Sequence, residues 1–181
     1  MRASDQGLMG VKLVLGLRNP GEEYKGTYHN VGGLFVDYLA SVLGVSFKKA
    51  RYFEYAKSNG LILAKSLVYM NESGIAAAAA VKYFDLAGDQ LSVAHDDSDL
   101  TLGNFKISAG QSAAGHHGIE SVIVALGTKD FSRIRIGVRP GQEVKRKKAG
   151  EFVLNHISRN NSKILEGAFD KIYQDLKNSP N

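Results

Sequence analysis

Short aliphatic segments alternate along the chain with longer segments in which apolar residues recur every three or four positions. The run 11–17, VKLVLGL, is followed by Asn19-Pro20-Gly21, which is typical of a buried strand that ends in a turn. Apolar residues in 31–43 have the i, i+3, i+4, i+7 spacing of a helix with one buried face. Asn30 precedes this helix and is predicted to be its N-cap.

The remainder of the chain continues the alternation of strands and helices. The segments 51–58 and 61–69 flank Asn59-Gly60, and Asn-Gly favours the two-residue turn of a β-hairpin. Helices are predicted over 74–84, 119–126 and 162–176, and strands over 91–94, 105–108 and 133–139. This order predicts an α/β fold, a single-domain three-layer sandwich whose central sheet is mixed and mostly parallel. Residues 11–181 are expected to form that domain, and residues 1–10 a flexible leader without the apolar stretch of a signal peptide.

Composition excludes several classes of protein. The chain has 181 residues, 44% of them hydrophobic and 23% charged, which is globular usage. Cysteine is absent, which excludes disulfide scaffolds, thiolate metal sites and cysteine nucleophiles. No apolar run approaches the roughly 20 residues of a membrane span, so we expect a soluble, cytoplasmic protein that does not enter membranes. The net charge of +5 is compatible with a polyanionic partner but does not identify one.

Polar side chains occur where predicted strands lead into predicted helices. Ligands of open α/β sheets bind beyond the carboxyl ends of the strands, so such residues are expected to share one cleft. They are Asn19, His29, Asn71, Asp96 and His116.

This set of side chains suggests hydrolysis by activated water. A neutral imidazole such as that of His29 is a suitable general base near pH 7, and Asp96 can accept a hydrogen bond from one of its nitrogens. An asparagine amide can stabilise the negative charge of an oxyanion. No serine stands in a G-x-S-x-G motif, so an acyl-enzyme is not favoured. Taken singly, His95 and His156 are interpreted as ordinary core or surface residues.

Four segments resemble the signatures of one family. The string 15–32, LGLRNPGEEYKGTYHNVG, resembles the first signature of bacterial peptidyl-tRNA hydrolases, in which G-L-x-N-P-G precedes a tyrosine and then His-Asn-x-G. The other segments follow in the family's order: YMNESG (69–74), VAHDDSDL (93–100) with GQSAAGHHGIESVI (110–123), and FSRIRIGVRPG (131–141). The resemblance, over about residues 11–155, implies a monomeric α/β sandwich. It also implies hydrolysis of the ester that joins a peptide to the 3′ end of tRNA, without a metal or cofactor.

The resemblance implies roles for individual residues. His29 resembles the catalytic base and Asp96 the carboxylate that orients it, whereas Asp97, one position past the match, is the less favoured alternative. Asn19 and Asn71 resemble cleft amides that bind the peptide backbone and steady the reacting carbonyl.

Further positions of the substrate site follow from the same match. Tyr24 resembles the residue beside the terminal nucleotide, Met70 the apolar wall next to it, and His116 the loop histidine. The family has G-H-N-G where this chain has GHHG, so His117 replaces an asparagine. A neutral histidine keeps one donor and one acceptor, and we expect it to retain part of the substrate-binding role.

Basic residues near the end of the resemblance predict how RNA is held. Arg133, Arg135 and Arg139 alternate with aliphatic residues, which places them on one face of a strand. By itself this pattern fits a solvated face, whereas the resemblance favours Arg135, together with Lys106, as a contact to tRNA phosphate. The basic run 145–148 is expected to add non-specific attraction to phosphates.

Two other functions compete with the hydrolase interpretation. A catalytically weak or silent RNA-binding relative of the same fold is supported by His117 alone. A general hydrolase of small esters lacks a nucleophile motif and leaves the arginine pattern unexplained.

Overall fold

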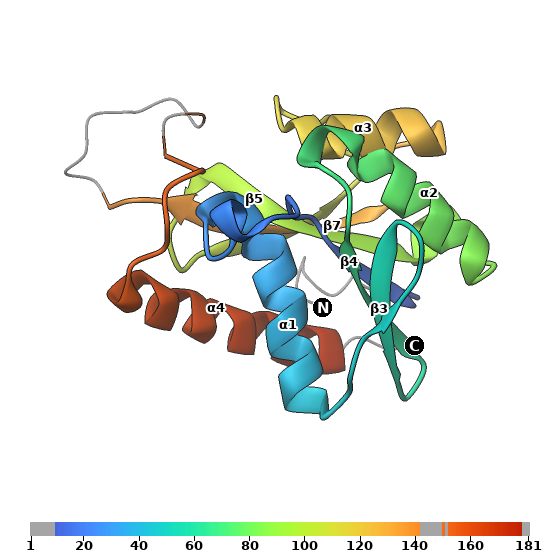
Figure 1. Ribbon diagram of the computed structural model, residues 1–181, viewed down its shortest axis with the longest axis horizontal. Coiled ribbons are helices and arrows are strands. Elements are labelled where there is room, and N and C mark those ends of the chain that lie inside the picture. Colours follow the sequence, from blue (N-terminus) through green and yellow to red (C-terminus); the bar gives the residue numbers. More distant parts are fainter. Residues whose placement is uncertain (1–9, 142–149, 151, 179–181) are drawn as a thin grey trace.

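The middle layer of the protein is a seven-stranded sheet (Figure 1), described here from a computed structural model that covers residues 10–141, 150 and 152–178. The strand order is β2-β3-β4-β1-β5-β7-β6. Neighbouring strands among β4, β1, β5 and β7 are parallel, whereas β2-β3, β3-β4 and β6-β7 pair antiparallel. The strands are β1 (Leu13–Gly16), β2 (Lys48–Lys49), β3 (Phe53–Ser58), β4 (Leu61–Ser66), β5 (Leu91–Thr101), β6 (Phe105–Ala109) and β7 (Ser132–Arg139).

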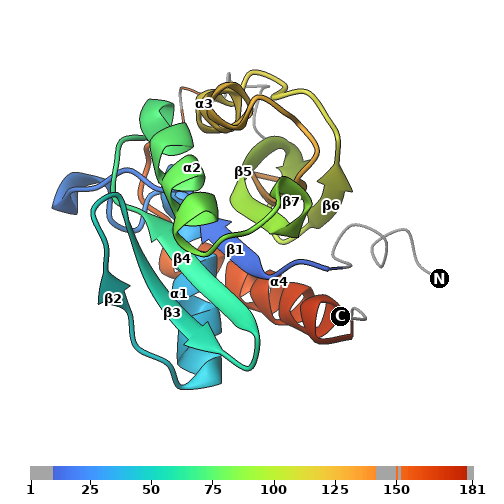
Figure 2. The same cartoon turned by 90° about the vertical axis from the view of Figure 1, so that its right-hand side faces the viewer.

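Helices cover both faces of the sheet, so the predicted three-layer sandwich is confirmed (Figure 2). On one face, α1 (Val31–Leu43) and α4 (Arg159–Asn178) bury Phe35 and Phe169 against Ile134. On the other face, α2 (Ser73–Tyr83) and α3 (His117–Leu126) bury Ala77 and Ile119 in a second core. None of the helices in the described part of the chain is both long and apolar enough to cross a membrane.

Glycine allows the start of α1 to approach the sheet closely. A Cβ atom added to Gly32 would lie 2.1 Å from the carbonyl oxygen of Ala94 in β5, a distance that real Cβ atoms do not reach. A Cβ on Gly16, at the end of β1, would lie 2.4 Å from the Gly32 carbonyl oxygen. The residues just before α1, including His29, are therefore held beside the ends of β1 and β5.

Most predicted elements are confirmed, and the hairpin is the clearest case. Its turn residues Asn59 and Gly60 have φ angles of 43° and 85°, the left-handed values that a two-residue Asn-Gly turn requires. The two-residue strand β2 was not predicted, because its two exposed lysines carry no pattern. The last helix begins at Arg159, earlier than the predicted 162.

The predicted strand 91–94 was too short. β5 continues to Thr101, because His95 and Asp96 pair in register with Arg135 and Ile136 of β7. Sequence reasoning ended the strand where polar residues begin, but His95, Asp96 and Asp97 are all buried. Most of the expected leader (1–9) and the basic run 145–148 lie outside the described residues.

Candidate active site

A cavity of about 550 Å³ opens beyond the end of β1 and along the second half of β5. Its position agrees with the general rule that ligands of α/β sheets bind at the carboxyl ends of the strands. Most of the predicted site residues line it: Asn19, Tyr24, His29, Asp96, His116, His117 and Arg135.

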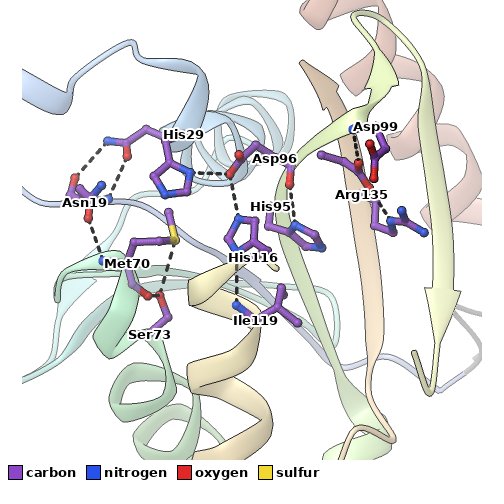
Figure 3. A network of polar contacts seen from close by, with 12 residues as sticks. Asn19, His29, Met70, Ser73, His95, Asp96, Asp99, His116, Ile119 and Arg135 are labelled. Atoms are coloured by element: carbon purple, nitrogen blue, oxygen red, sulfur yellow. Dashed lines mark hydrogen bonds and ion pairs between the residues drawn. The ribbon is translucent and has the colours of Figure 1, made fainter. Parts of the chain in front are cut away.

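The carboxylate of Asp96 lies at the centre of the site and binds two histidines (Figure 3). Asp96 Oδ1 is 2.8 Å from Nδ1 of His29 and 3.0 Å from Nε2 of His116. Asp96 comes from β5, His29 from the turn before α1, and His116 from the residue that precedes α3. Asp96, predicted at the end of a strand, therefore lies within β5 and is 4% exposed.

The hydrogen bonds define which nitrogen of each ring carries the proton. His116 Nδ1 accepts a hydrogen bond from the backbone N–H of Ile119, at 3.3 Å, so its Nε2 carries the hydrogen that Asp96 accepts. His29 donates through Nδ1 to the same carboxylate oxygen. The lone pair of neutral His29 is consequently on Nε2, and the ring lines the cavity. This is the tautomer that a general base needs.

The two histidines also determine the charge of Asp96. Burial alone would raise the pKa of this carboxyl, but the nearby His116 and His29 outweigh it and hold the pKa well below its usual range. Asp96 is therefore ionised at any pH at which the protein is expected to work, and it remains an acceptor for both rings.

A second hydrogen-bonded group fixes Asn19 at the edge of the cavity. The side-chain oxygen of Asn30 accepts from the Asn19 backbone N–H at 2.8 Å, and its amide donates to the Asn19 carbonyl at 3.0 Å. Asn19 Oδ1 accepts from the backbone N–H of Met70 at 2.7 Å. Because the oxygen is engaged in this way, the Nδ2 amino group of Asn19 is the free end of its amide. Asn30 stands at the N-cap position of α1, as predicted, but its side chain makes no cap hydrogen bond to the helix.

Two of the residues predicted to bind the ester end of the substrate, Asn71 and Met70, do not line the cavity. Asn71 belongs to the short turn Met70–Glu72, where it is exposed, and it does not line the cavity. Met70 is 4% exposed, and its sulfur lies so close to α3 that a Cβ on Gly118 would be 2.6 Å away. Met70 thus contributes its backbone N–H to Asn19 and packs in the core. The structure shows no apolar wall formed by its side chain.

An aromatic ring and a further imidazole ring also border the cavity. Tyr24 lines it and lies edge-on to the half-exposed Tyr69, with ring centroids 6.4 Å apart. His117, the first residue of α3, also lines the cavity, and its side chain is 80% exposed. Its Nδ1 lies 3.8 Å from the carboxylate of Glu120, which is also exposed.

His95 is a buried histidine that sequence reasoning treated as ordinary. Its Nδ1 donates to the backbone carbonyl of Asp96 at 2.7 Å, and its ring packs edge-on against His116, 4.7 Å between centroids. Burial, aided by the nearby His116, lowers the pKa of His95 well below its usual value. His95 is accordingly neutral and packs against the ring of His116.

The arginines of β7 have different surroundings. The predicted alternation is confirmed, with Ile134, Ile136 and Val138 fully buried on the opposite face. Arg133 is only 3% exposed and donates to the carbonyl of Ser112 at 2.8 Å, so the solvated face expected there is wrong for this residue. The carbonyl of Ser112 belongs to the loop that leads to His116, which Arg133 thereby holds.

Arg135 and Lys106 lie next to each other at the sheet's edge. They are paired across β7 and β6, which places both side chains on the same face. Arg135 lines the cavity and bonds Asp97 at 2.6 Å, whereas Lys106 is exposed and does not line the cavity. Asp97, the alternative orienting carboxylate, is engaged with Arg135 and makes no described contact with His29.

The segment 152–157 is part of the site that the sequence did not suggest. His29 donates its backbone N–H to the Val153 carbonyl at 2.7 Å, and Tyr28 donates to Asn155 at 3.2 Å. Val153 and Leu154 line the cavity as well. These contacts are made by backbone atoms, so no residue type in this segment signals them.

His29, Asp96 and His116 are also the cluster of described residues that could hold a metal ion. Their ligand atoms lie within 4.8 Å of one another. In the hydrogen-bonding arrangement given above, however, each ring directs an N–H at the carboxylate. These nitrogens act as donors to Asp96, and a metal would need both of them deprotonated.

Comparisons with known proteins agree with this geometry. The family model described as peptidyl-tRNA hydrolase matches residues 13–179. A peptidyl-tRNA hydrolase of Prochlorococcus marinus (strain MIT 9313) is 40% identical in an alignment 175 residues long, which covers 92% of this chain and 85% of that protein. One of Aquifex aeolicus is 38% identical, covering 90% of this chain and 86% of the relative. The crystal structure of peptidyl-tRNA hydrolase from Acinetobacter baumannii superposes with a TM-score of 0.80 at 26% identity, over 94% of both chains. The chain belongs to the peptidyl-tRNA hydrolase family.

Proposed function

We propose that this protein hydrolyses the ester bond between a peptide, or an N-blocked aminoacyl group, and the 3′ end of tRNA. The observation that carries this proposal is the hydrogen-bonded set of His29, Asp96 and His116 in an open cavity. An ionised, buried carboxylate fixes the base in the required tautomer, and family membership supplies the class of substrate.

The reaction begins with a water molecule between His29 and the ester carbonyl. Nε2 of His29 takes a proton from this water as its oxygen attacks the carbonyl carbon, and Asp96 stabilises the resulting imidazolium. The tetrahedral intermediate then breaks its bond to the ribose 3′ oxygen, which receives the proton from His29. The products are a tRNA with a free 3′ hydroxyl and a peptide whose new carboxylic acid releases its proton to the solvent.

Asn19 is the group best placed to stabilise the negative charge of the intermediate. Its amide oxygen is held by the Met70 backbone N–H at 2.7 Å, so the amino group is oriented before substrate binds. A pre-oriented donor is worth about 3–4 kcal/mol of transition-state stabilisation in known oxyanion holes. Asn71 is exposed, and we propose no role for it in this step.

Tyr24 and His117 are proposed to contact the terminal nucleotide or the peptide, because both line the cavity beside His29. Arg135 and Lys106 are proposed to bind tRNA phosphate, Arg135 at the cavity and Lys106 at the neighbouring surface. We further propose that the protein acts as a monomer in the cytoplasm, where its tRNA substrate occurs.

The experiment that tests this function compares two substrates of the wild-type protein. We expect an N-acetyl-aminoacyl-tRNA to be hydrolysed with a much higher kcat/KM than the p-nitrophenyl ester of the same N-acetyl amino acid. Equal or faster hydrolysis of the small ester would indicate a general esterase. Tight binding of the tRNA ester without turnover would instead indicate the silent RNA-binding relative, and would contradict the role proposed for His29.

A further inference from the structure

The carboxylate of Asp97 holds Arg135 from the buried side. Asp97 Oδ2 accepts a hydrogen bond from Nε of Arg135 at 2.6 Å, and the Asp97 side chain is only 8% exposed. Asp97 Oδ1 accepts a second hydrogen bond, at 2.8 Å, from the backbone N–H of Asp99. Both oxygens are thus engaged, so the carboxylate cannot rotate away without losing a hydrogen bond.

This contact determines which part of the Arg135 guanidinium is free. Nε is occupied by Asp97, whereas neither Nη1 nor Nη2 has a hydrogen-bond acceptor among the described residues. The side chain is 19% exposed and lines the catalytic cavity, so the terminal nitrogens are available to a ligand (Figure 3). Lys106 stands directly opposite on β6 and adds a second positive charge.

Asp97 also offsets repulsion between neighbouring cations. Arg133 and Arg135 are two positions apart on the same face of β7, with Arg133 nearly fully buried. Burial and the nearby Arg135 both lower the pKa of Arg133, and Asp97 opposes that effect. A carboxylate at this place therefore offsets part of the repulsion between the two guanidinium groups.

We infer that Asp97 is a positioning residue for the substrate: it orients Arg135 so that the terminal guanidinium nitrogens meet a phosphate of the tRNA. This inference rests on the proposed function and adds a residue that acts only through Arg135. Its neighbour Asp96 binds His29 and His116 instead, because successive residues of a strand point in opposite directions. Two adjacent carboxylates thus have separate tasks, one at the base and one at the phosphate contact.

Asp97 has two opposing effects on the binding of phosphate by Arg135. A carboxylate beside an arginine reduces the positive charge that a phosphate meets. If this reduction were its main effect, removing Asp97 would tighten tRNA binding. If orientation is its main effect, removing it weakens binding, because an arginine free to rotate loses entropy when it binds phosphate.

The test measures kcat and KM for N-acetyl-aminoacyl-tRNA with the variants Asp97→Ala and Asp97→Asn. We expect Asp97→Ala to raise KM about fivefold, since charge-assisted contacts to phosphate are the strong ones. Most of the loss in kcat/KM should come from this rise in KM and only a smaller part from kcat. Asp97→Asn keeps an oxygen that can accept from Nε, so we expect it to recover part of the affinity. The matched control is Asp170→Ala, which removes the same charge from an exposed residue of α4 that does not line the cavity, and it should change KM less than about twofold.

Two further measurements separate this inference from the proposed function. In the Arg135→Ala background, adding Asp97→Ala should change KM no further, because the residue through which Asp97 acts is gone. The KM shift should also be larger for the tRNA ester than for the same N-acetyl-aminoacyl ester of adenosine, which has no phosphate. A lower KM in both Asp97 variants, or equal shifts for the two substrates, would overturn the inference. A wild-type protein that hydrolyses neither ester would overturn the proposed function instead.

Discussion

At the scale of single residues, three neighbouring side chains of β5 differ sharply in chemistry although all are buried. His95 is neutral and supports the ring of His116, Asp96 is ionised and binds two histidines, and Asp97 binds Arg135. The sequence allowed Asp96 to be chosen over Asp97 by its place in the motif. It gave no means of assigning a partner to Asp97, because that partner lies on another strand.

The buried His95 makes stability depend on pH. Its pKa is lowered in the folded state, so the unfolded chain binds the proton first as pH falls below about 6.5. The stability that depends on neutral His95 is complete above that pH and is lost below it, at up to about 1.4 kcal/mol per pH unit. Urea unfolding at pH 7 and pH 5 measures this loss.

The variant His95→Asn is the control for that prediction. Its amide can still donate to the Asp96 carbonyl, in the place of the imidazole Nδ1, but it cannot titrate. We expect it to be less stable than the wild type at pH 7 and to lose less stability between pH 7 and pH 5. An equal loss in both proteins would show that other groups cause the acid sensitivity.

At the scale of elements, the sequence pattern predicted which helices and strands occur better than it predicted where they begin and end. The alternation in 133–139 and the Asn-Gly hairpin were predictable because period two and a left-handed turn are local properties. The true length of β5 was not, because its polar residues are stabilised by pairing with β7 and by distant histidines. The hydrogen bonds between 152–157 and the residues around His29 were not predictable either, since backbone groups make them and they do not depend on residue type.

The approach of α1 to β5 gives a prediction at this scale. Gly32→Ala would place a Cβ atom 2.1 Å from the Ala94 carbonyl oxygen, so the helix must move away from the sheet. Overpacking of this kind costs about 1–3 kcal/mol, or roughly 2–4 °C in Tm for each kcal/mol in a chain of this size. Because His29 precedes the same helix, kcat should fall as well. Thermal unfolding and a turnover assay measure the two effects.

Gly33→Ala is the matched control, since it makes the same substitution one position along α1. Its nearest atoms belong to the flexible side chain of Arg18, with Cδ at 3.0 Å. Alanine is also the better helix former, by about 1 kcal/mol. We expect Gly33→Ala to leave Tm nearly unchanged. Equal effects of the two substitutions would contradict the close approach of α1.

At the scale of the whole molecule, the site is assembled from segments that are far apart in the chain. Asn19, His29, Asp96, His116 and Arg135 come from five different segments and meet because the parallel strands end at one edge of the sheet. The fold class predicted this convergence, and the family signatures selected the residues. Neither the fold class nor the signatures predicted that Asn71 and Met70 do not line the cavity. Their exposure and packing depend on how α2 and α3 dock.

The arrangement also orders the charges along the cavity. The base and its carboxylate lie near the end of β1, and Arg135 lines the cavity on β7, with Lys106 beside it on the neighbouring exposed surface of β6. A substrate with an ester at one end and a phosphate-rich body at the other matches this order. The chemistry and the tRNA contact can therefore be altered separately, which makes a direct test of the base possible.

That test is the rate at which His29→Ala releases an N-acetyl-aminoacyl group from tRNA, measured with the wild type at saturating substrate and alongside direct tRNA binding. A general base contributes about 10²- to 10⁴-fold, so kcat should fall by that factor while the Kd for tRNA stays within about twofold of wild type. A variant that keeps the wild-type kcat would contradict the account, since another group would then have to activate the water.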